Sequence, residues 1–255
     1  MVPMERTRWN TGREVQVAAG LILAVAICSA TVFQKLSYQW NWAVMVDYWR
    51  VFLMGLGLTV VISLGALVVS IVIGVALAAA QLSGSVVLRW SARAYVELIR
   101  GTPLLVQLLI GYFVIANALG LKNEFVVGVV LLSVFAGAYL AEILRGGVAS
   151  VSASQIEAAR AVGFDRIQIF RFVTAPQALR RVLPAMTGEF VSLVKNSSLL
   201  SVIGIQEFTY QAQVANAATY NSLEAFIPLA LGYLALTLPM AGVAAWMERK
   251  LRYED

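Results

Sequence analysis

The sequence predicts an all-α, polytopic membrane protein with about six transmembrane helices and with the N and C termini in the cytoplasm. Hydrophobic residues make up 60% of the 255 residues and charged residues only 13%, and the mean hydropathy is +0.79. Soluble domains carry roughly 25% charged residues. Largely apolar runs long enough to cross a bilayer follow one another along the chain, and Lys and Arg gather between alternate runs.

Several kinds of chemistry are excluded by the residues that the chain lacks. It contains no histidine and a single cysteine, Cys28, which rules out an intrachain disulfide, a Cys/His zinc site and a histidine acid or base. The GxxxxGK[ST] motif that binds nucleotide phosphates is absent. We therefore expect no catalytic residue, metal site or cofactor on this chain, which is not predicted to be an enzyme.

The first 50 residues are predicted to form an N-terminal anchor helix and an external aromatic connection. Residues 1–14 are polar, and residues 15–33 form an uncharged run just long enough to span a bilayer of about 30 Å. A signal peptide is the alternative interpretation, but a convincing small-residue cleavage site is missing. The aromatic cluster in 35–50 is of the kind that settles at the headgroup level.

Residues 51–255 are predicted to form one transmembrane domain, because neither a low-complexity segment nor an internal repeat divides them. Glycines interleaved with Leu and Val in the second apolar run suit close helix packing in lipid. The expected spans after the N-terminal one are 51–82, 94–119, 125–144, 183–200 and 223–246.

The distribution of basic residues predicts the orientation of these spans. Nearly every Lys and Arg falls within 1–14, 89–93, 145–181 or 249–252, whereas only Lys35, Arg50 and Lys122 fall on the opposite side. Short cytoplasmic loops carry an excess of positive charge, so both termini are expected inside the cell. The net charge of +5 is thereby explained by topology, and a nucleic-acid partner is not expected.

The third span contains a predicted break. Arg100, Gly101, Thr102 and Pro103 follow one another near its cytoplasmic end, and such interruptions are tolerated only where protein or a watery cavity satisfies the freed backbone groups. A gating role is one interpretation of this motif. The other is a plain proline kink with an arginine at headgroup level.

One long polar and basic segment, 149–181, separates the fourth and fifth spans and is predicted to be a cytoplasmic loop. Each arginine near the bilayer centre would cost roughly 2.5–3.5 kcal/mol. A short helix is expected to start near Glu157 and to stop at the flexible Gly163. Pro176 is expected to end a second helical piece, 167–173, and to turn the chain back toward the membrane. The arginines are Arg160, Arg166, Arg171, Arg180 and Arg181.

This loop resembles the EAA loop of bacterial ABC importer permeases. The residues that carry the resemblance are Glu157, Ala158 and Ala159, with Gly163 four residues and Pro176 seventeen residues after the last of them. The flanking sequences AEILRGGVASV and PQALRRVLP, and RGTPLLVQL near the third span, are similar to the polar amino acid branch of that family. The family usually has Leu-Pro where this chain has Ala-Pro. A basic loop of an unrelated membrane protein is the alternative, but two long motifs in the right order favour the family.

The resemblance implies a type I importer core of five helices, to which this chain adds an N-terminal helix. It also implies that the EAA residues, Gly163 and Pro176 couple to a dimer of ATPase subunits, which would bind ATP and magnesium. The other implied partners are a second permease subunit, identical or a sibling chain, and an extracytoplasmic amino-acid-binding protein. The implied location is the inner membrane of a bacterial cell, as a multi-pass protein in contact with lipid.

Four polar residues in the fifth span are candidates for contact with a solute: Glu189, Lys195, Asn196 and Ser197. Charged groups inside a span normally face the bundle interior and mark a pathway, and the resemblance places this stretch along the translocation path. The alternative is a hydrogen-bonded cluster that joins helices. Since Asn196 stands where the branch often has Asp, a neutral polar or acidic amino acid is expected, such as glutamine or glutamate.

A second class of function is a self-sufficient ion-coupled carrier or a channel for small solutes. Carriers commonly show internal repeats and have their own site for the coupling ion, and the sequence shows neither. The importer permease is therefore the favoured hypothesis.

Overall fold

The structure, a computed structural model, describes residues 38–251 together with residues 16, 17, 19, 20, 23, 24, 27, 30 and 31. The chain divides into two compact units, Met1–Asn41 and Trp42–Asp255, and each is considered by itself. In the first unit the described residues within the predicted span 15–33 are helical. The rest of that span, and the two termini whose cytoplasmic location was predicted, lie outside the described residues.

The second unit is helical, and no β-strand occurs among the residues that the structure describes. This confirms the all-α prediction. In chain order the elements are α2 (Ala43–Leu82), α3 (Val86–Gly101), α4 (Leu104–Ile110), the π-helical segment η1 (Gly111–Ala116), α5 (Glu124–Ala149), α6 (Ala153–Ala161), α7 (Arg166–Gln168), the π-helical segment η2 (Ile169–Thr174), α8 (Ala175–Asn196), the 3₁₀ segment η3 (Ser197–Ile203), α9 (Phe208–Thr219) and α10 (Ser222–Leu251).

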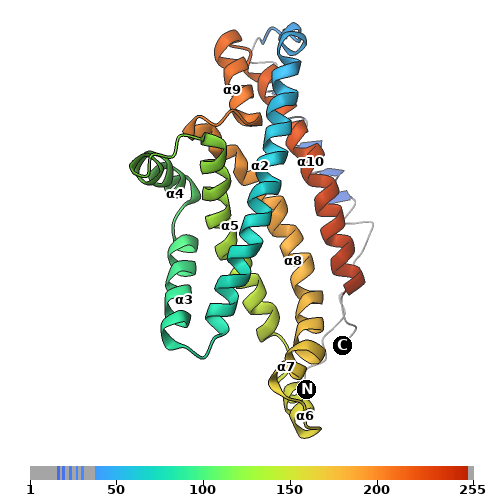
Figure 1. The fold of residues 1–255 in the computed structure, drawn as a ribbon. Coiled ribbons are helices and arrows are strands. Elements are labelled where there is room, and N and C mark those ends of the chain that lie inside the picture. The colour runs from blue at the N-terminus through green and yellow to red at the C-terminus, as the bar shows by residue number, and fades with distance from the viewer. Residues whose placement is uncertain are drawn as a thin grey trace. The chain divides into compact units, whose positions relative to one another are not determined.

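Three of the described helices, α2, α5 and α10, are long and apolar enough to cross a membrane. A fourth candidate is α3 together with α4 and η1, which are bent by 106° at the predicted break. The predicted fifth span corresponds to α8 and the start of η3. Helix α8 is too polar to count among the candidates by composition, and it packs instead between α5 and α10 (Figure 1).

Close glycine contacts hold the long helices together. A Cβ on Gly74 of α2 would come within 2.8 Å of the Cβ of Leu140 and within 3.3 Å of the Gly137 carbonyl oxygen, both in α5. The backbones of α2 and α5 therefore approach too closely for any larger residue at this crossing. At another height Gly55 of α2 meets α9, where a Cβ would come within 3.0 Å of the Cα of Phe208.

The segments predicted to be cytoplasmic lie at one end of this unit. Helices α6 and α7, the connection between α2 and α3 and the end of α10 share that end, whereas α9 and the start of α2 lie at the other (Figure 1). The predicted external segment 201–222 contains α9, packed against α2 and α10. Tyr220 ends α9 with φ +58°, a left-handed conformation that costs a non-glycine residue about 1–2 kcal/mol.

Several local predictions differ from the structure. Helix α2 begins at Ala43, eight residues before the predicted span, and α3 begins at Val86, so that two of the arginines expected in a loop, Arg89 and Arg93, are helical. The side chain of Ser85 accepts a hydrogen bond from the backbone N–H of Leu88 and caps α3. The apolar periodicity alone did not indicate this cap.

The predicted turn at Pro176 is wrong. The chain is helical from Arg166 to Asn196, and Pro176 lies at the start of α8, directly after the π-helical segment η2, so the helix continues through it. The reversal comes earlier, between α6 and α7, where Asp165 forms a capping box with Gln168. Helix α6 also begins at Ala153, four residues before the predicted start.

Candidate functional site

The four candidate solute contacts occupy the junction of α8 and η3, and the structure separates their side chains. Lys195 is exposed on a groove between α8 and α10, whereas Glu189 and Asn196 are half-buried and do not line it. Ser197 is fully buried, and its hydroxyl donates to the carbonyl of Val194 at 2.8 Å. The α-helix ends at Asn196, and a 3₁₀ segment begins at Ser197.

The predicted gate and one predicted solute contact lie close together. Arg100 ends α3, and its guanidinium carbon lies 5.4 Å from the centre of the Tyr139 ring in α5. The positive charge of Arg100 acts on Glu142 of α5 and on Glu189 of α8. Arg100 and Glu189, from two separate sequence motifs, are thus near enough for the charge of Arg100 to act on the Glu189 carboxyl.

A glutamine that the sequence analysis missed holds the break between α3 and α4. The side-chain nitrogen of Gln107 donates to the carbonyls of Ile99 at 2.7 Å and Thr102 at 3.0 Å, and lies 2.8 Å from the Thr102 hydroxyl oxygen. These bonds satisfy carbonyls that the helix end leaves free. An amide four residues after Pro103, in an otherwise apolar run, was the available signal. A Cβ on Gly101 would meet no described atom within 4 Å.

The short helix of the predicted coupling loop presents two of its three signature residues to solvent. In α6, Ala159 is buried, whereas Glu157 and Ala158 are exposed. Gly163 follows with φ +88°, and its N–H bonds to the carbonyl of Arg160 at 3.0 Å. The predicted stop at Gly163 is confirmed, because this left-handed conformation strains any residue with a Cβ.

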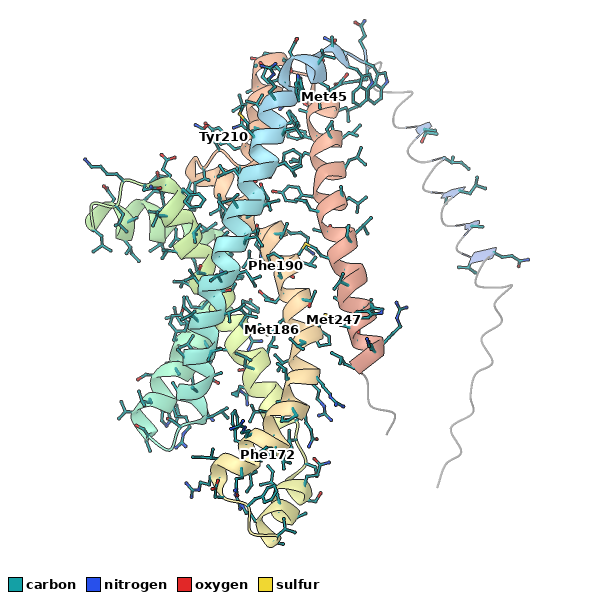
Figure 2. All side chains as sticks on the ribbon, turned by 45° about the vertical axis from the view of Figure 1, so that its right-hand side comes forward. Met45, Phe172, Met186, Phe190, Tyr210 and Met247 are labelled. Carbon is teal, nitrogen blue, oxygen red and sulfur yellow. The ribbon has the colours of Figure 1, made fainter. Side chains whose placement is uncertain are left out.

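The surface beside α6 is apolar as well as basic. Five large hydrophobic residues are exposed there although the segment is not a membrane span, and we call them the loop surface. Figure 2 shows Phe172 at this end, opposite Met45 and Tyr210. The arginines of the loop were predicted from the sequence but this patch was not, and its composition is typical of a protein–protein contact. The loop surface consists of Val162, Phe164, Ile167, Phe170 and Phe172.

A second missed feature is a buried carboxylate at the start of α9. Glu207 is fully buried, and its Oε2 accepts hydrogen bonds from the hydroxyls of Tyr233 at 2.9 Å and Thr59 at 3.3 Å. Its Oε1 accepts from the N–H of Tyr210 at 2.9 Å. Burial raises the pKa of Glu207 above its ordinary value, and these donors oppose the shift. This Glu207 cluster ties α9 to α2 and α10. A lone acidic residue in a stretch without Lys or Arg was the available signal.

The groove between α8 and α10 has a volume of about 880 Å³, within the range of small-molecule sites. Three basic residues and one acidic residue line it, and small side chains form much of its wall. No three His, Cys, Asp or Glu side chains in the described part of the chain lie close enough to hold a metal ion. The lining residues are Arg180, Arg181, Pro184, Ala185, Gly188, Val191, Ser192, Lys195, Ala241, Ala244, Ala245, Glu248 and Leu251.

Residues 70–253 match the protein family described as "Binding-protein-dependent transport system inner membrane component". The chain belongs to this family. The family resemblance inferred from the EAA loop is thereby confirmed, and the chain is a membrane component of a transport system.

Two curated members of the family show how far the similarity extends. The chain is 37% identical over 212 residues to the probable glutamine ABC transporter permease protein GlnM of Bacillus subtilis (strain 168), covering 83% of this chain and 98% of GlnM. It is 35% identical over 202 residues to the arginine transport system permease protein ArtQ of the same organism, covering 79% and 92%.

A solved structure agrees in fold. The crystal structure of an amino acid ABC transporter with histidines has a chain that is 34% identical to this one and superposes with a TM-score of 0.78. The match covers 84% of this chain and 100% of the other. The family match begins at residue 70, so residues 1–69 fall outside it.

Proposed function

We propose that this chain is the permease subunit of an ABC importer that moves a polar amino acid into the cytoplasm, driven by separate ATPase subunits. The observation that carries this proposal is the loop surface beside α6, which is exposed and apolar at the end of the unit that lies opposite α9. Such a patch on a segment outside the spans fits a protein partner. The residues proposed to couple to the ATPase are Glu157, Ala158, Ala159, Gly163 and Pro176.

The proposed complex contains two ATPase subunits, which bind ATP and magnesium, and a second permease subunit that is identical or a sibling chain. An extracytoplasmic amino-acid-binding protein delivers the solute. Residues 1–50 serve as an anchor and external connection, and residues 51–255 form the permease domain with its coupling loop at 149–181. The proposed location is the inner membrane of a bacterial cell.

The proposed solute is a neutral polar or acidic amino acid, such as glutamine or glutamate. Its ammonium and carboxylate both need partners in a dry path; the Glu189 carboxyl can accept from the ammonium and the Arg100 guanidinium can donate to the carboxylate. The named relatives include permeases for glutamine and for arginine. The groove between α8 and α10 carries more basic than acidic residues and therefore disfavours a further positive charge on the solute.

Reconstitution tests the proposed function. The chain is co-expressed with its ATPase, purified and placed in liposomes with ATP inside and the binding protein and labelled glutamine outside. We expect uptake that requires ATP, the binding protein and a stoichiometric ATPase chain. Uptake by this chain alone, driven by an ion gradient, would instead establish the carrier alternative.

Two substitutions in the same assay test the solute. Asn196→Asp should shift preference toward cationic amino acids, because it adds a negative charge, whereas Glu189→Gln should weaken uptake of every amino acid. Asn221→Asp is the matched control, since it makes the same change at the start of α10. The charge argument is wrong if arginine is the best wild-type solute and Asn196→Asp changes nothing.

A further inference from the structure

One side chain at the inner mouth of the groove also holds the joint that leads to α6. Arg181 lines the groove between α8 and α10, and its Nη1 donates to the carbonyl of Ser150 at 2.8 Å. Ser150 caps the C-terminus of α5, and Ser152 is the N-cap of α6. The guanidinium therefore touches both the groove and the link between a membrane helix and the coupling helix, and it satisfies a carbonyl that the end of α5 leaves free.

The groove faces water or protein rather than lipid chains. Lys195 is exposed on its wall and lies about 21 Å from Arg181 by helical rise along α8. If this wall faced lipid, the exposed Lys195 ammonium would lie among acyl chains about 21 Å from the end of the unit at Arg181, which would cost free energy. With Arg180 beside Arg181 and only Glu248 as an acid, the lining attracts anionic groups such as carboxylates.

The helices around Arg181 are closely packed. The long Arg181 side chain is therefore the group that can change its hydrogen-bond partner. A Cβ on Gly147 of α5 would overlap Cγ2 of Val182 and would come within 3.3 Å of the Ala178 carbonyl oxygen in α8. Helices α5 and α8 are therefore closely packed at this height. The bond from Arg181 to Ser150 has a neutral acceptor, and a carboxylate is a stronger acceptor that binds guanidinium through two parallel bonds.

We propose that the inner mouth of the groove is an exit site for the carboxylate of the transported amino acid, and that Arg181 transmits its occupancy to α6. The inference rests on the proposed function, because it needs an amino acid to leave through this groove. While the groove is empty, Arg181 holds the Ser150 carbonyl. When a carboxylate arrives, the guanidinium pairs with it, the joint before α6 loses that hydrogen bond, and ATP hydrolysis slows until the solute leaves.

The test measures ATP hydrolysis by the complete complex in nanodiscs without binding protein, so that added amino acid reaches the groove directly. The probes are L-glutamine and L-glutaminamide, which differ in having and lacking the carboxylate. L-Glutamine at millimolar concentration should lower the wild-type rate by half or more, and the amide should leave it unchanged. Arg181→Gln should abolish the response, and Arg181→Lys should weaken it. Arg249→Gln, a basic residue that does not line the groove, should respond like wild type.

Each outcome bears on the exit site separately from the proposed function. An unresponsive wild-type rate, equal inhibition by the amide or a full response in Arg181→Gln would overturn the exit site, while ATP-driven uptake in liposomes would still support the importer. If uptake itself does not depend on ATP, the proposed function fails. Should Arg181→Gln not assemble, Arg181→Lys decides: a weakened response supports the exit site and an unchanged response overturns it.

Discussion

The hydroxyl of Tyr233 donates a hydrogen bond to the carboxylate of Glu207 at 2.9 Å, joining α10 to the start of α9. The same Tyr233 oxygen lies 3.0 Å from the hydroxyl of Thr209. Glu207 is thus held by hydroxyl and backbone donors. Removing one donor from a buried carboxylate that is held in this way strongly destabilises the folded protein.

Tyr233→Phe should therefore lower the free energy of unfolding by about 1.5–3 kcal/mol, the range for a hydrogen bond to a charged group. Thermal unfolding of the purified chain in detergent measures the loss. Tyr112→Phe is the matched control, since the Tyr112 hydroxyl lies 3.5 Å from Glu124 in an exposed position and should contribute under about 1 kcal/mol. Equal losses in the two variants would show that Glu207 gains nothing from Tyr233.

The raised pKa of Glu207 predicts a pH dependence of stability. A carboxyl whose folded-state pKa exceeds its unfolded value contributes most below the unfolded pKa of about 4.3, and this contribution is lost as pH rises through the folded pKa. Glu207→Gln stays neutral throughout. The unfolding midpoint of wild type should consequently fall relative to that of Glu207→Gln as pH increases from about 4. A constant difference across that range would contradict the raised pKa.

Adjacent glycines in α5 offer a test of the α5–α8 contact. Gly147→Ala should lower stability by about 1–3 kcal/mol through overpacking, because its Cβ would overlap Val182. Gly146→Ala should be neutral or stabilising, since a Cβ there meets no described atom within 4 Å and alanine favours the helix. Thermal unfolding compares them, and Val182→Ala should restore part of the loss in Gly147→Ala. Similar midpoints for the two alanine variants would disprove the close contact.

Coupling through α6 is tested at Gly163 and Ala158. Gly163→Val should abolish binding-protein-stimulated ATP hydrolysis, because valine does not tolerate the observed φ of +88°. Ala158→Asp should act likewise by placing a charge in the contact with the ATPase that we propose for the exposed Ala158. Gly163→Asn is the control and should be milder, since asparagine visits left-handed conformations. Normal uptake and normal ATPase stimulation in the valine and aspartate variants would remove the loop from the coupling mechanism.

Topology is tested with single cysteines in a Cys28→Ala background. Cysteines at Ser91, Ser154 and Asn221 are treated with a membrane-impermeant thiol reagent in intact cells. Only the cysteine at Asn221 should react from outside, because Ser91 and Ser154 lie at the end of the unit predicted to be cytoplasmic. Labelling at position 154 from outside would show that the orientation is the opposite of the predicted one and that the loop 149–181 is not cytoplasmic.

Features that depend on local residue chemistry could be predicted from the sequence. The lengths of the apolar runs predicted the long helices. The end of α6 at Gly163 was predicted because glycine readily adopts the positive φ that it has there. The interruptions at Thr102-Pro103 and at Ser197 follow from proline and hydroxyl residues inside spans. In each case the residue type restricts its own backbone, so neighbours in space were not needed to find it.

Features that depend on which helices meet could not be predicted. A proline is compatible both with the end of a helix and with its first turn. Which of the two applies to Pro176 depends on whether α7 and η2 continue into α8, as they do in the structure. The contact of Thr59 with Glu207 joins residues 148 positions apart. In lipid, apolar residues surround a helix on every side, so periodicity does not show which face meets a neighbour. That Arg100 lies near Glu189 could not be predicted for the same reason.

The Glu207 cluster also sets an order for biogenesis. A chain is made from its N-terminus, so Thr59 reaches the membrane first, Glu207 follows 148 residues later and Tyr233 another 26 residues after that. Until α10 has inserted, Glu207 lacks one donor and α9 lacks one of the helices that pack against it. A nascent or truncated chain that stops short of α10 therefore holds the Glu207 carboxylate without the Tyr233 hydroxyl, so the last helix completes the polar contacts of the opposite end of the unit.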